Sequence, residues 1–165
     1  MSSRREALQR QIEEAFADVP YPGDDHIIDD PNDWEAAELL ACFKGKHWKE
    51  LGYEDLFQNS LSFVGIDAYA FYLPAYLLGA LDDYKDLISV VFGLCPTWSE
   101  EDAEHLQWQL RRYDRLNNRQ RAAVRSFLEY MREEMSQYFG MFTRFEDALA
   151  RYWSREAASD GGGAP

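Results

Sequence analysis

The stretch AYAFYLPAYLLGAL, residues 68–81, is the longest run of the chain without a charged residue. Its second half, residues 75–81, predicts a buried helix because it is apolar on every side. A membrane span would need about 20 predominantly apolar residues, and Asp67 directly precedes this run, so we predict no span. Asp67 is a predicted N-cap for the helix. Pro74 would cost roughly 3 kcal/mol inside a continuous helix, so we expect a kink or break near Leu73.

Upstream of this run, apolar residues recur at helical spacing and predict helices over residues 3–17, 31–45 and 53–58. Ser3 opens the first helix with a capping box, and Pro31 suits the first position of the second. The residues of the second helix that we expect to face the core are Trp34, Ala37, Leu40 and Ala41.

Downstream, the same periodicity predicts a helix over residues 83–92 and then three more. The predicted N-caps of these three are Thr97, Asn118 and Thr143. Apart from residues 60–64, nothing shows the alternation of a strand with hairpin turns. The side chains that we expect to be buried in the three helices are Ala103, Leu106, Leu110 and Tyr113, then Val124, Phe127, Leu128, Met131 and Met135, then Phe145, Leu149, Tyr152 and Trp153.

Length and composition indicate one domain. The chain has 165 residues, of which 46% are hydrophobic and 15% aromatic, enough for one packed core. We therefore predict an all-α fold, a compact array of about seven or eight short helices over residues 1–157. Residues 158–165 have nothing apolar of any size to bury and are predicted to be a disordered tail.

The chain has no predicted export signal and no cysteine pattern typical of secreted domains. Its first residues lack the apolar segment and the small-residue cleavage site of a signal peptide. Cys42 and Cys95 are far apart in apolar surroundings, so we expect buried, reduced thiols. These features favour a cytoplasmic protein.

The charge of the chain is strongly negative and unevenly distributed. The net charge is -13, which argues against nucleic acid as a partner because phosphate contact needs Lys and Arg. Between Asp18 and Glu38 there are eight acidic residues and no Lys or Arg. From Arg111 to Arg125 there are six arginines and only one acidic residue, Asp114. These arginines either form an exposed anion-binding face or pair with carboxylates, and we favour pairing with the Asp24–Asp33 acids or with a partner.

The segment PYPGDDHIIDDPNDWE, residues 20–35, is the densest part of the acidic region. It is open to three interpretations: a metal site, a binding surface, or a solvated connection whose carboxylates favour the next helix N-terminus. It lacks the central glycine and terminal glutamate of an EF-hand loop, and no histidine has a zinc spacing, so no metal is predicted. The residues predicted to contact a partner are Tyr21, Asp24, Asp25, Asp29, Asp30, Asp33 and Trp34.

No motif of an enzyme class occurs in the chain. There is no GxSxG, P-loop or GxGxxG sequence, so no catalytic residue and no cofactor is predicted. A spatially assembled active site is invisible in one sequence, and it stays open as an alternative around His26, His47 and Asp67. A structural subunit of a homo-oligomer is a further alternative.

Four segments resemble a family of small bacterial proteins classed as a domain of unknown function. They are PYPGD at 20–24, FKGKHW at 43–48, FYLPAYLL at 71–78 and RAAVRSFLEY at 121–130. The resemblance spans about residues 6–153. It implies a bacterial, cytoplasmic protein and transfers no catalytic residue.

These observations lead to one functional prediction. The absence of a catalytic motif, the net charge of -13 and the acidic stretch without bases indicate a non-enzymatic interaction protein. We expect an immunity-type or regulatory subunit that binds a protein partner with a basic surface.

Overall fold

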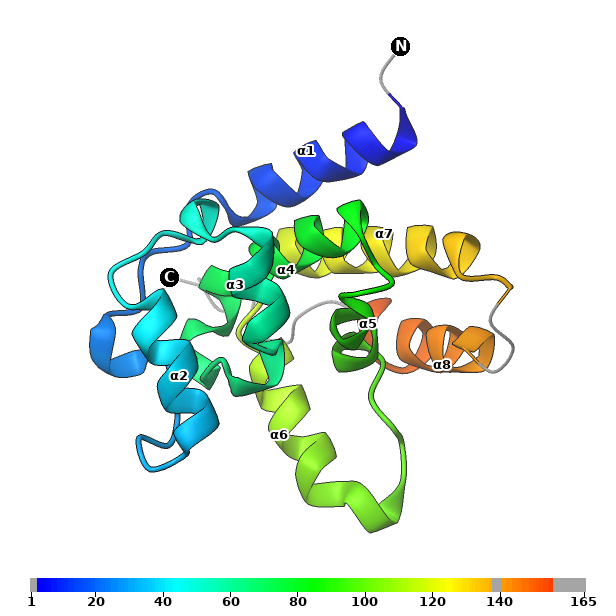
Figure 1. The fold of residues 1–165 in the computed structure, drawn as a ribbon. Helices are drawn as coiled ribbons and strands as arrows, with labels where there is room; N and C mark the ends of the chain where they lie inside the picture. Colours follow the sequence, from blue (N-terminus) through cyan, green and yellow to red (C-terminus); the bar gives the residue numbers. More distant parts are fainter. Residues whose placement is uncertain (1–2, 138–140, 156–165) are drawn as a thin grey trace, which may run out of the picture.

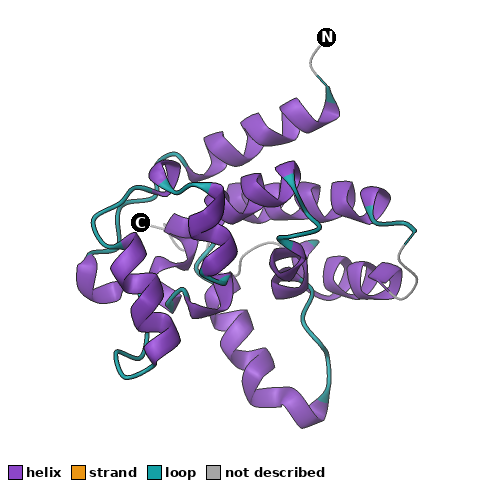
Figure 2. Cartoon of the chain, in the orientation of Figure 1, coloured by secondary structure: helices purple, strands orange, loops and turns teal. Residues whose placement is uncertain are grey.

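The computed structural model describes residues 3–137 and 141–155, and within these ranges the chain is all-α (Figure 1). Figure 2 shows helices and loops but no strand in the described part of the chain. The predicted tail, residues 158–165, lies outside the described ranges. The helices are α1 (Arg4–Phe16), α2 (Trp34–Phe43), α3 (Tyr53–Gln58), α4 (Tyr69–Asp82), α5 (Ile88–Leu94), α6 (Ala103–Tyr113), α7 (Asn118–Glu134) and α8 (Met141–Ala148), which continues into a π-helical turn at Leu149–Trp153.

Helix α4 lies at the centre of this single domain (Figure 1). It packs against α1, α3 and α5, and α1 also packs against α7. Of its 14 residues, 10 are buried. Because each large apolar side chain that is fully buried stabilises the fold by roughly 1.5–3 kcal/mol, α4 is the main organiser of the core.

Helix α4 is continuous through Pro74, so of the kink or break expected near Leu73, the break is not found. Pro74 has no N–H group to donate to the carbonyl of Ala70, and the helix loses one hydrogen bond there. Burial offsets that loss, because Leu73 and Leu77 have no exposed surface.

The predicted N-cap role of Asp67 is wrong. The N-cap residue of α4 is Ala68, which makes no side-chain hydrogen bond, and Asp67 belongs to a preceding 3₁₀ helix at Ile66–Ala68. The continuation of one helix into the other leaves no free first turn for Asp67 to cap. Its carboxylate instead forms an ion pair with Arg115, with 2.8 Å between Asp67 Oδ1 and Arg115 Nη2.

Helix α2 begins three residues later than predicted, and its buried face also differs from the predicted one. The Asp33 carboxylate caps the helix by accepting hydrogen bonds from the backbone N–H groups of Glu35 and Ala36, at 3.0 and 3.3 Å. The predicted inward face is wrong: Trp34, Ala37 and Ala41 are exposed, and Leu40 is half-buried. The side chains that do face the core are Ala36, Leu39 and Phe43.

The starts of α5 and α6 also differ from the predictions. Helix α5 begins at Ile88 rather than residue 83, because the Asp83 side chain accepts hydrogen bonds from the backbone of Lys85 and Asp86 and closes a turn there. Ser99, not Thr97, caps the 3₁₀ turn that precedes α6, with its hydroxyl accepting from the Glu101 N–H at 3.2 Å.

The face that α6 presents to the core differs from the predicted one. Tyr113 is buried as expected, but Ala103 is exposed, and Leu106 and Leu110 are only half-buried. The buried side chains of α6 are Gln109, Arg112 and Tyr113.

Helices α7 and α8 keep their predicted apolar stripes but not their predicted caps. Asn117, not Asn118, caps α7, in a reciprocal pair with Gln120. Thr143 lies inside α8 rather than at its start. The stripe side chains, all of them buried, are Val124, Phe127, Leu128, Met131, Met135, Phe145, Leu149, Tyr152 and Trp153.

Two other local predictions, the capping box of α1 and the bounds of α3, are confirmed. The capping box of α1 is present, with the Glu6 N–H donating to Ser3 Oγ at 3.1 Å and the Ser3 N–H donating to Glu6 Oε2 at 2.9 Å. Helix α3 has the predicted bounds. Both cysteines are free thiols, but only Cys95 is buried as expected, and this burial raises its pKa to about 12; Cys42 is half-buried. Within the described residues, no helix has the length and apolar character that a bilayer crossing requires.

Candidate functional site

The acidic segment between α1 and α2, residues 20–35, is attached to the core through residues in its middle. Ile27 is fully buried, and its carbonyl oxygen accepts a hydrogen bond from the Gly65 N–H at 2.8 Å. Two residues later, Asp29 Oδ1 accepts from the Ile66 N–H at 2.9 Å. These contacts join the segment to the entry of α4, so the position of Asp29 serves the fold.

Tyr21 and Asp24 form a second attachment. The Tyr21 hydroxyl donates to the Asp24 carboxylate and accepts from the Gly45 N–H at 2.8 Å. Its ring meets the edge of Phe71, with 5.6 Å between ring centroids. Partial burial and the hydrogen bond to Asp24 raise the pKa of Tyr21. Tyr21 is therefore a bridge between the segment, α4 and the end of α2, with 38% of its surface exposed.

The remaining aspartates of the segment differ in what they bind. Asp33 caps α2, and Asp30 accepts a hydrogen bond from the Asn32 N–H at 2.9 Å. Asp25 is exposed and makes no hydrogen bond or ion pair with a described residue. Asp25 and Asp30 are consequently the aspartates most available to a partner.

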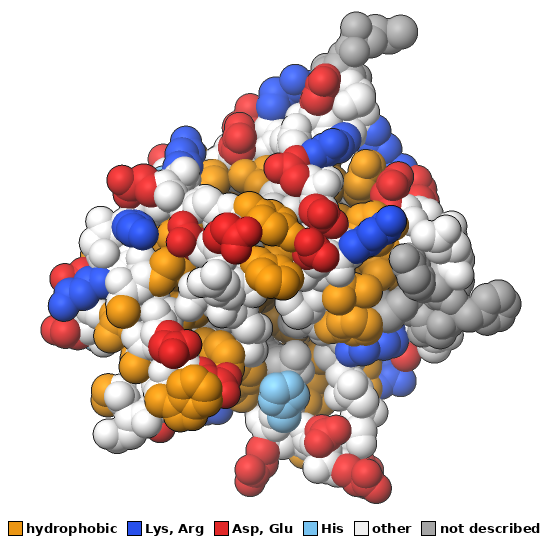
Figure 3. Space-filling view, in the orientation of Figure 1, with side chains coloured by type: hydrophobic (Ala, Val, Ile, Leu, Met, Phe, Trp, Pro, Cys, Tyr) orange, Lys and Arg blue, Asp and Glu red, His pale blue; other side chains and the backbone are white. Residues whose placement is uncertain are grey.

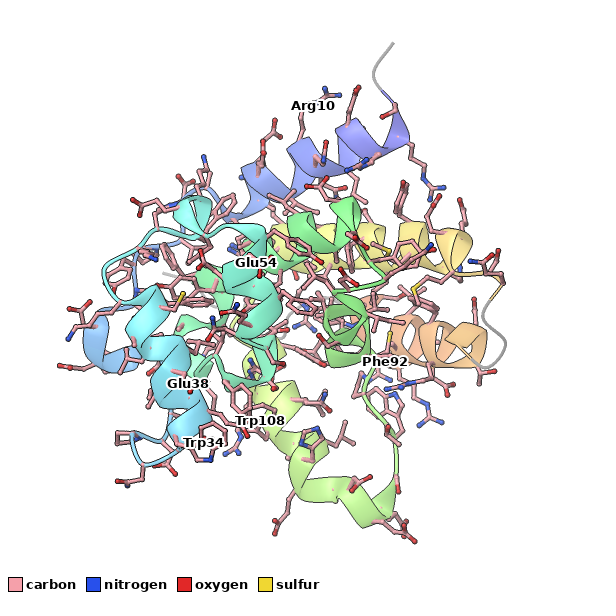
Figure 4. All side chains as sticks on the ribbon, viewed as in Figure 1. Arg10, Trp34, Glu38, Glu54, Phe92 and Trp108 are labelled. Carbon is pink, nitrogen blue, oxygen red and sulfur yellow. The ribbon has the colours of Figure 1, made fainter. Side chains whose placement is uncertain are left out.

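Trp34 stands at the start of α2 with 69% of its surface exposed. Glu38 is four residues further along and therefore lies on the same side of the helix (Figure 4). Glu35 and Glu38 are both exposed. We call Asp25, Asp30, Trp34, Glu35 and Glu38 the acidic surface. The two glutamates are not in the predicted contact set, which ends at Trp34.

A second pair of exposed aromatics lies on α3. The rings of Tyr53 and Phe57 stack with 6.1 Å between centroids and 11° between planes, and Phe57 is 55% exposed. The Tyr53 hydroxyl donates to Asp86, and this hydrogen bond raises the pKa of Tyr53 to about 12. Figure 3 shows hydrophobic side chains on the face that α2 and α3 form, with Asp and Glu side chains beside them.

The sequence contained a signal for the α3 pair that its periodicity alone did not reveal. A six-residue helix has room for one inward side chain per turn, and only Leu56 is buried in α3. Phe57 directly follows Leu56 and therefore points to a different side of the helix, and Tyr53, four residues before Phe57, lies next to it.

The arginine-rich region does not pair with the acidic segment. Among the described residues, its ion pairs are Arg115 with Asp67 at 2.8 Å and Arg121 with Asp114 at 4.0 Å. The expected internal pairing with Asp24–Asp33 is therefore wrong, because Arg121 of α7 pairs with Asp114 of the α6–α7 linker, and Arg115 of that linker pairs with Asp67 at the entry of α4. The acidic surface keeps its negative charge uncompensated by these arginines.

The residues of the alternative active site are only partly brought together. His26 Nδ1 lies 3.6 Å from Asp67 Oδ2, and Arg115 shares that carboxylate. His47 has other partners. Its Nδ1 accepts a hydrogen bond from the Lys49 N–H at 3.1 Å, and its ring packs against that of Phe71 with 5.1 Å between the ring centroids. No described group of three or more His, Cys, Asp or Glu residues is arranged as a metal site.

Comparison with known proteins places the chain in one family. No curated protein and no solved structure matches it. The model of a family described as "Family of unknown function (DUF6714)" matches residues 4–157. This agrees with the resemblance to a domain of unknown function, and because the match covers nearly the whole chain, the protein belongs to family DUF6714.

Proposed function

We propose that this protein is a non-enzymatic interaction protein of the bacterial cytoplasm, of the immunity or regulatory type, that binds a protein partner with a basic surface. The observation that carries the proposal is the exposure of Trp34, at 69%, in a region without Lys or Arg from Asp18 to Glu38. An aromatic side chain of this size normally buries about 150–250 Å².

Trp34 supplies the apolar contact in this proposal. Tryptophan is enriched among the few residues that dominate binding energy, and such residues lie near the centre of an interface. Carboxylates around it would meet Lys and Arg of the partner at the rim. Because exposed charges act mainly on encounter rates and on the choice of partner, we expect them to set salt dependence more than total affinity.

The structure divides the predicted contact set by role. Asp29 and Asp33 satisfy backbone N–H groups, and Tyr21 and Asp24 hold the segment to the core. Changing these residues would disturb the fold as well as a partner. A clean test therefore uses the acidic surface.

The test is affinity capture from a cytoplasmic extract followed by titration of the captured partner. Two variants are compared with the natural chain: Trp34→Ala, and the fourfold change Asp25→Asn, Asp30→Asn, Glu35→Gln and Glu38→Gln. We expect Trp34→Ala to weaken binding by more than about tenfold. The fourfold variant should bind more slowly at low salt and lose most of the salt dependence of association.

A matched control removes the same number of charges elsewhere. Glu100, Glu101, Asp102 and Glu104 are all exposed and lie around the start of α6. Their amide variants have the same net charge as the test variant. If the control weakens capture as much as the test variant does, the acidic surface is not the binding site.

Self-association is the second function that a specific observation favours. Phe57 is 55% exposed and stacked on Tyr53, so the α3 pair offers apolar area to a second copy. In such a dimer, the carboxylates beside the pair would lie near the same carboxylates of the second copy, and their like charges would repel each other. Sedimentation analysis separates the two proposals: a mass that rises with protein concentration and falls in Phe57→Ser supports the homo-oligomer.

A further inference from the structure

A cavity of about 360 Å³ opens between α5, α6, α8 and the 3₁₀ turn at Leu61–Phe63. Trp108 of α6 and Phe92 of α5, both labelled in Figure 4, line it. Serine and threonine hydroxyls, Gln109 and His105 supply polar groups, and Arg112 and Arg144 also line the cavity. None of the lining residues is Asp or Glu, although the chain has 30 acidic and 17 basic residues.

Arg112 brings a buried positive charge to this wall. It is 4% exposed, and its guanidinium lies between the rings of Tyr69 and Trp108, with 4.4 Å to each centroid. Its Nη2 donates to the carbonyl oxygens of Leu61 and Val64. Its buried Nε has no hydrogen-bond partner among the described residues, and no described carboxylate forms an ion pair with it.

Arg144 brings a second positive charge from α8. Its Nη2 donates to the Cys95 carbonyl oxygen at 2.7 Å, and its guanidinium lies 4.7 Å from the centroid of the Phe92 ring. No described carboxylate pairs with it either. Carbonyl oxygens and aromatic faces hold both guanidinium groups in place, but they do not neutralise the charges.

Burial of an unpaired charge destabilises a protein, and a bound counter-ion relieves that cost. Two fixed guanidinium groups in a concave, partly desolvated wall attract an anion more strongly than exposed arginines do. The aromatic side chains and Pro96 add an apolar wall that a bare inorganic ion would not use. The volume is at the lower end of the roughly 300–1,000 Å³ of ligand pockets.

We propose that this cavity binds a small organic anion that has a carboxylate or phosphate group and one apolar ring. The anionic group faces Arg112 and Arg144, and the ring lies against Phe92 and Trp108. The serine hydroxyls and Gln109 orient the ligand by hydrogen bonds. This site uses none of the residues of the acidic surface, so its test is independent of the proposed function.

The test is isothermal titration calorimetry of the purified chain with four probes: benzoate, phenyl phosphate, inorganic phosphate and benzyl alcohol. Tighter binding of benzoate or of phenyl phosphate identifies the anionic group as carboxylate or phosphate. Benzyl alcohol keeps the ring without the charge, and inorganic phosphate keeps the charge without the ring. We expect both of these to bind more weakly than the preferred ring-bearing anion. The indole N–H resonance of Trp108 should shift with that anion.

Arg112 also holds two backbone carbonyls, and its substitution would disturb folding. The test variants are therefore Arg144→Gln, which removes one charge, and Ser89→Leu, which fills the cavity from α5. Each should weaken the preferred anion by about tenfold or more, since charge-assisted hydrogen bonds and space are lost. The control is Arg111→Gln, which removes an exposed charge from the same helix as Arg112 and should leave affinity unchanged.

Three outcomes would overturn the site. One is the absence of heat and of any Trp108 shift with both ring-bearing anions. Another is equal affinity for a ring-bearing anion and for benzyl alcohol or inorganic phosphate, which would leave the charge or the ring without a role. The third is a loss of affinity in Arg111→Gln equal to that in Arg144→Gln.

Discussion

At the scale of single residues, the carboxylates between α1 and α2 have different tasks despite their similar sequence context. Asp33 completes the first turn of α2, and Asp29 satisfies a backbone N–H group at the entry of α4. Asp25 has neither role. Substitutions of these residues should therefore separate structural carboxylates from those available to a partner.

The first prediction concerns the cap of α2. Asp33→Ala should lower the free energy of unfolding by about 1 kcal/mol, because the N–H groups of Glu35 and Ala36 lose their acceptor. Urea denaturation at neutral pH measures the change. Asp25→Ala is the control and should change stability by less than about 0.5 kcal/mol. Equal losses in the two variants would contradict the assigned roles.

The second prediction concerns pH and Asp55. Hydrogen bonds, first from the Gly52 N–H and then from Cys42, lower the pKa of this carboxyl group. A lowered folded-state pKa stabilises the fold above the unfolded pKa, and that stability is lost as pH falls through the folded value. Asp55→Asn should therefore be less stable than the natural chain at pH near 7, and the difference should shrink toward pH about 3.

Urea midpoints at the two pH values check this prediction. Glu54 is the neighbouring exposed acid, so Glu54→Gln serves as the control and should show the same small effect at both pH values. A stability difference for Asp55→Asn that stays constant over this range would mean that charge at Asp55 does not matter.

At the scale of elements, the joint between the acidic segment and the entry of α4 is close-packed. A Cβ atom added at Gly65 would lie 2.9 Å from Asp29 Oδ1 and 3.0 Å from the carbonyl oxygen of Ile27. The backbone of residues 27–28 has no free space to move into, because Ile27 is fully buried. The glycine allows the two segments to approach each other.

The third prediction follows from this close approach. Gly65→Ala should destabilise the protein by about 1–3 kcal/mol, the usual cost of overpacking. Gly93→Ala is the matched control, because Gly93 lies inside α5 with nothing within 4 Å of a new Cβ atom. That control should be more stable than the natural chain by about 0.5–1 kcal/mol, since alanine favours a helix interior. Thermal unfolding of both variants measures the contrast, and a stabilised Gly65→Ala would contradict the packing.

At the scale of the whole molecule, acidic residues outnumber basic ones, whereas the cavity beside α6 has no acidic residue in its lining. The net charge of -13 repels itself across a domain of this size and opposes compaction. Added salt screens exposed charges, with a Debye length of about 10 Å at 0.1 M. That screening should therefore increase the stability of the folded state.

The fourth prediction is that salt stabilises the protein. Raising sodium chloride from about 0.01 M to about 0.3 M should raise the midpoint of thermal unfolding, because repulsion among carboxylates falls. The fourfold amide variant of the acidic surface should start from a higher midpoint and respond less to salt. A lower midpoint in high salt would show that attractive ion pairs outweigh the repulsion.

The sequence alone was sufficient for the all-α class, the buried helical segment at residues 75–81 and the apolar stripe of α7. These depend on periodicity and on long apolar runs, which are properties of neighbouring residues. The capping box at Ser3 and the bounds of α3 were predictable for the same reason. The sequence determined the starts of helices less well. Where two residues that can act as N-caps lie close together, as Asn117 and Asn118 do, the sequence does not decide which of them is the cap.

Tertiary structure alone decided which residues of α2 and α6 face inward and what the charges meet. Trp34, which was expected to face the core, is exposed, and packing beside Tyr69 and Trp108 buries Arg112 in a helix whose apolar residues had suggested another face. The cavity unites residues from four separate segments, so no local pattern contains it. Local spacing encodes helices, whereas burial and charge pairing depend on partners that are distant in the chain.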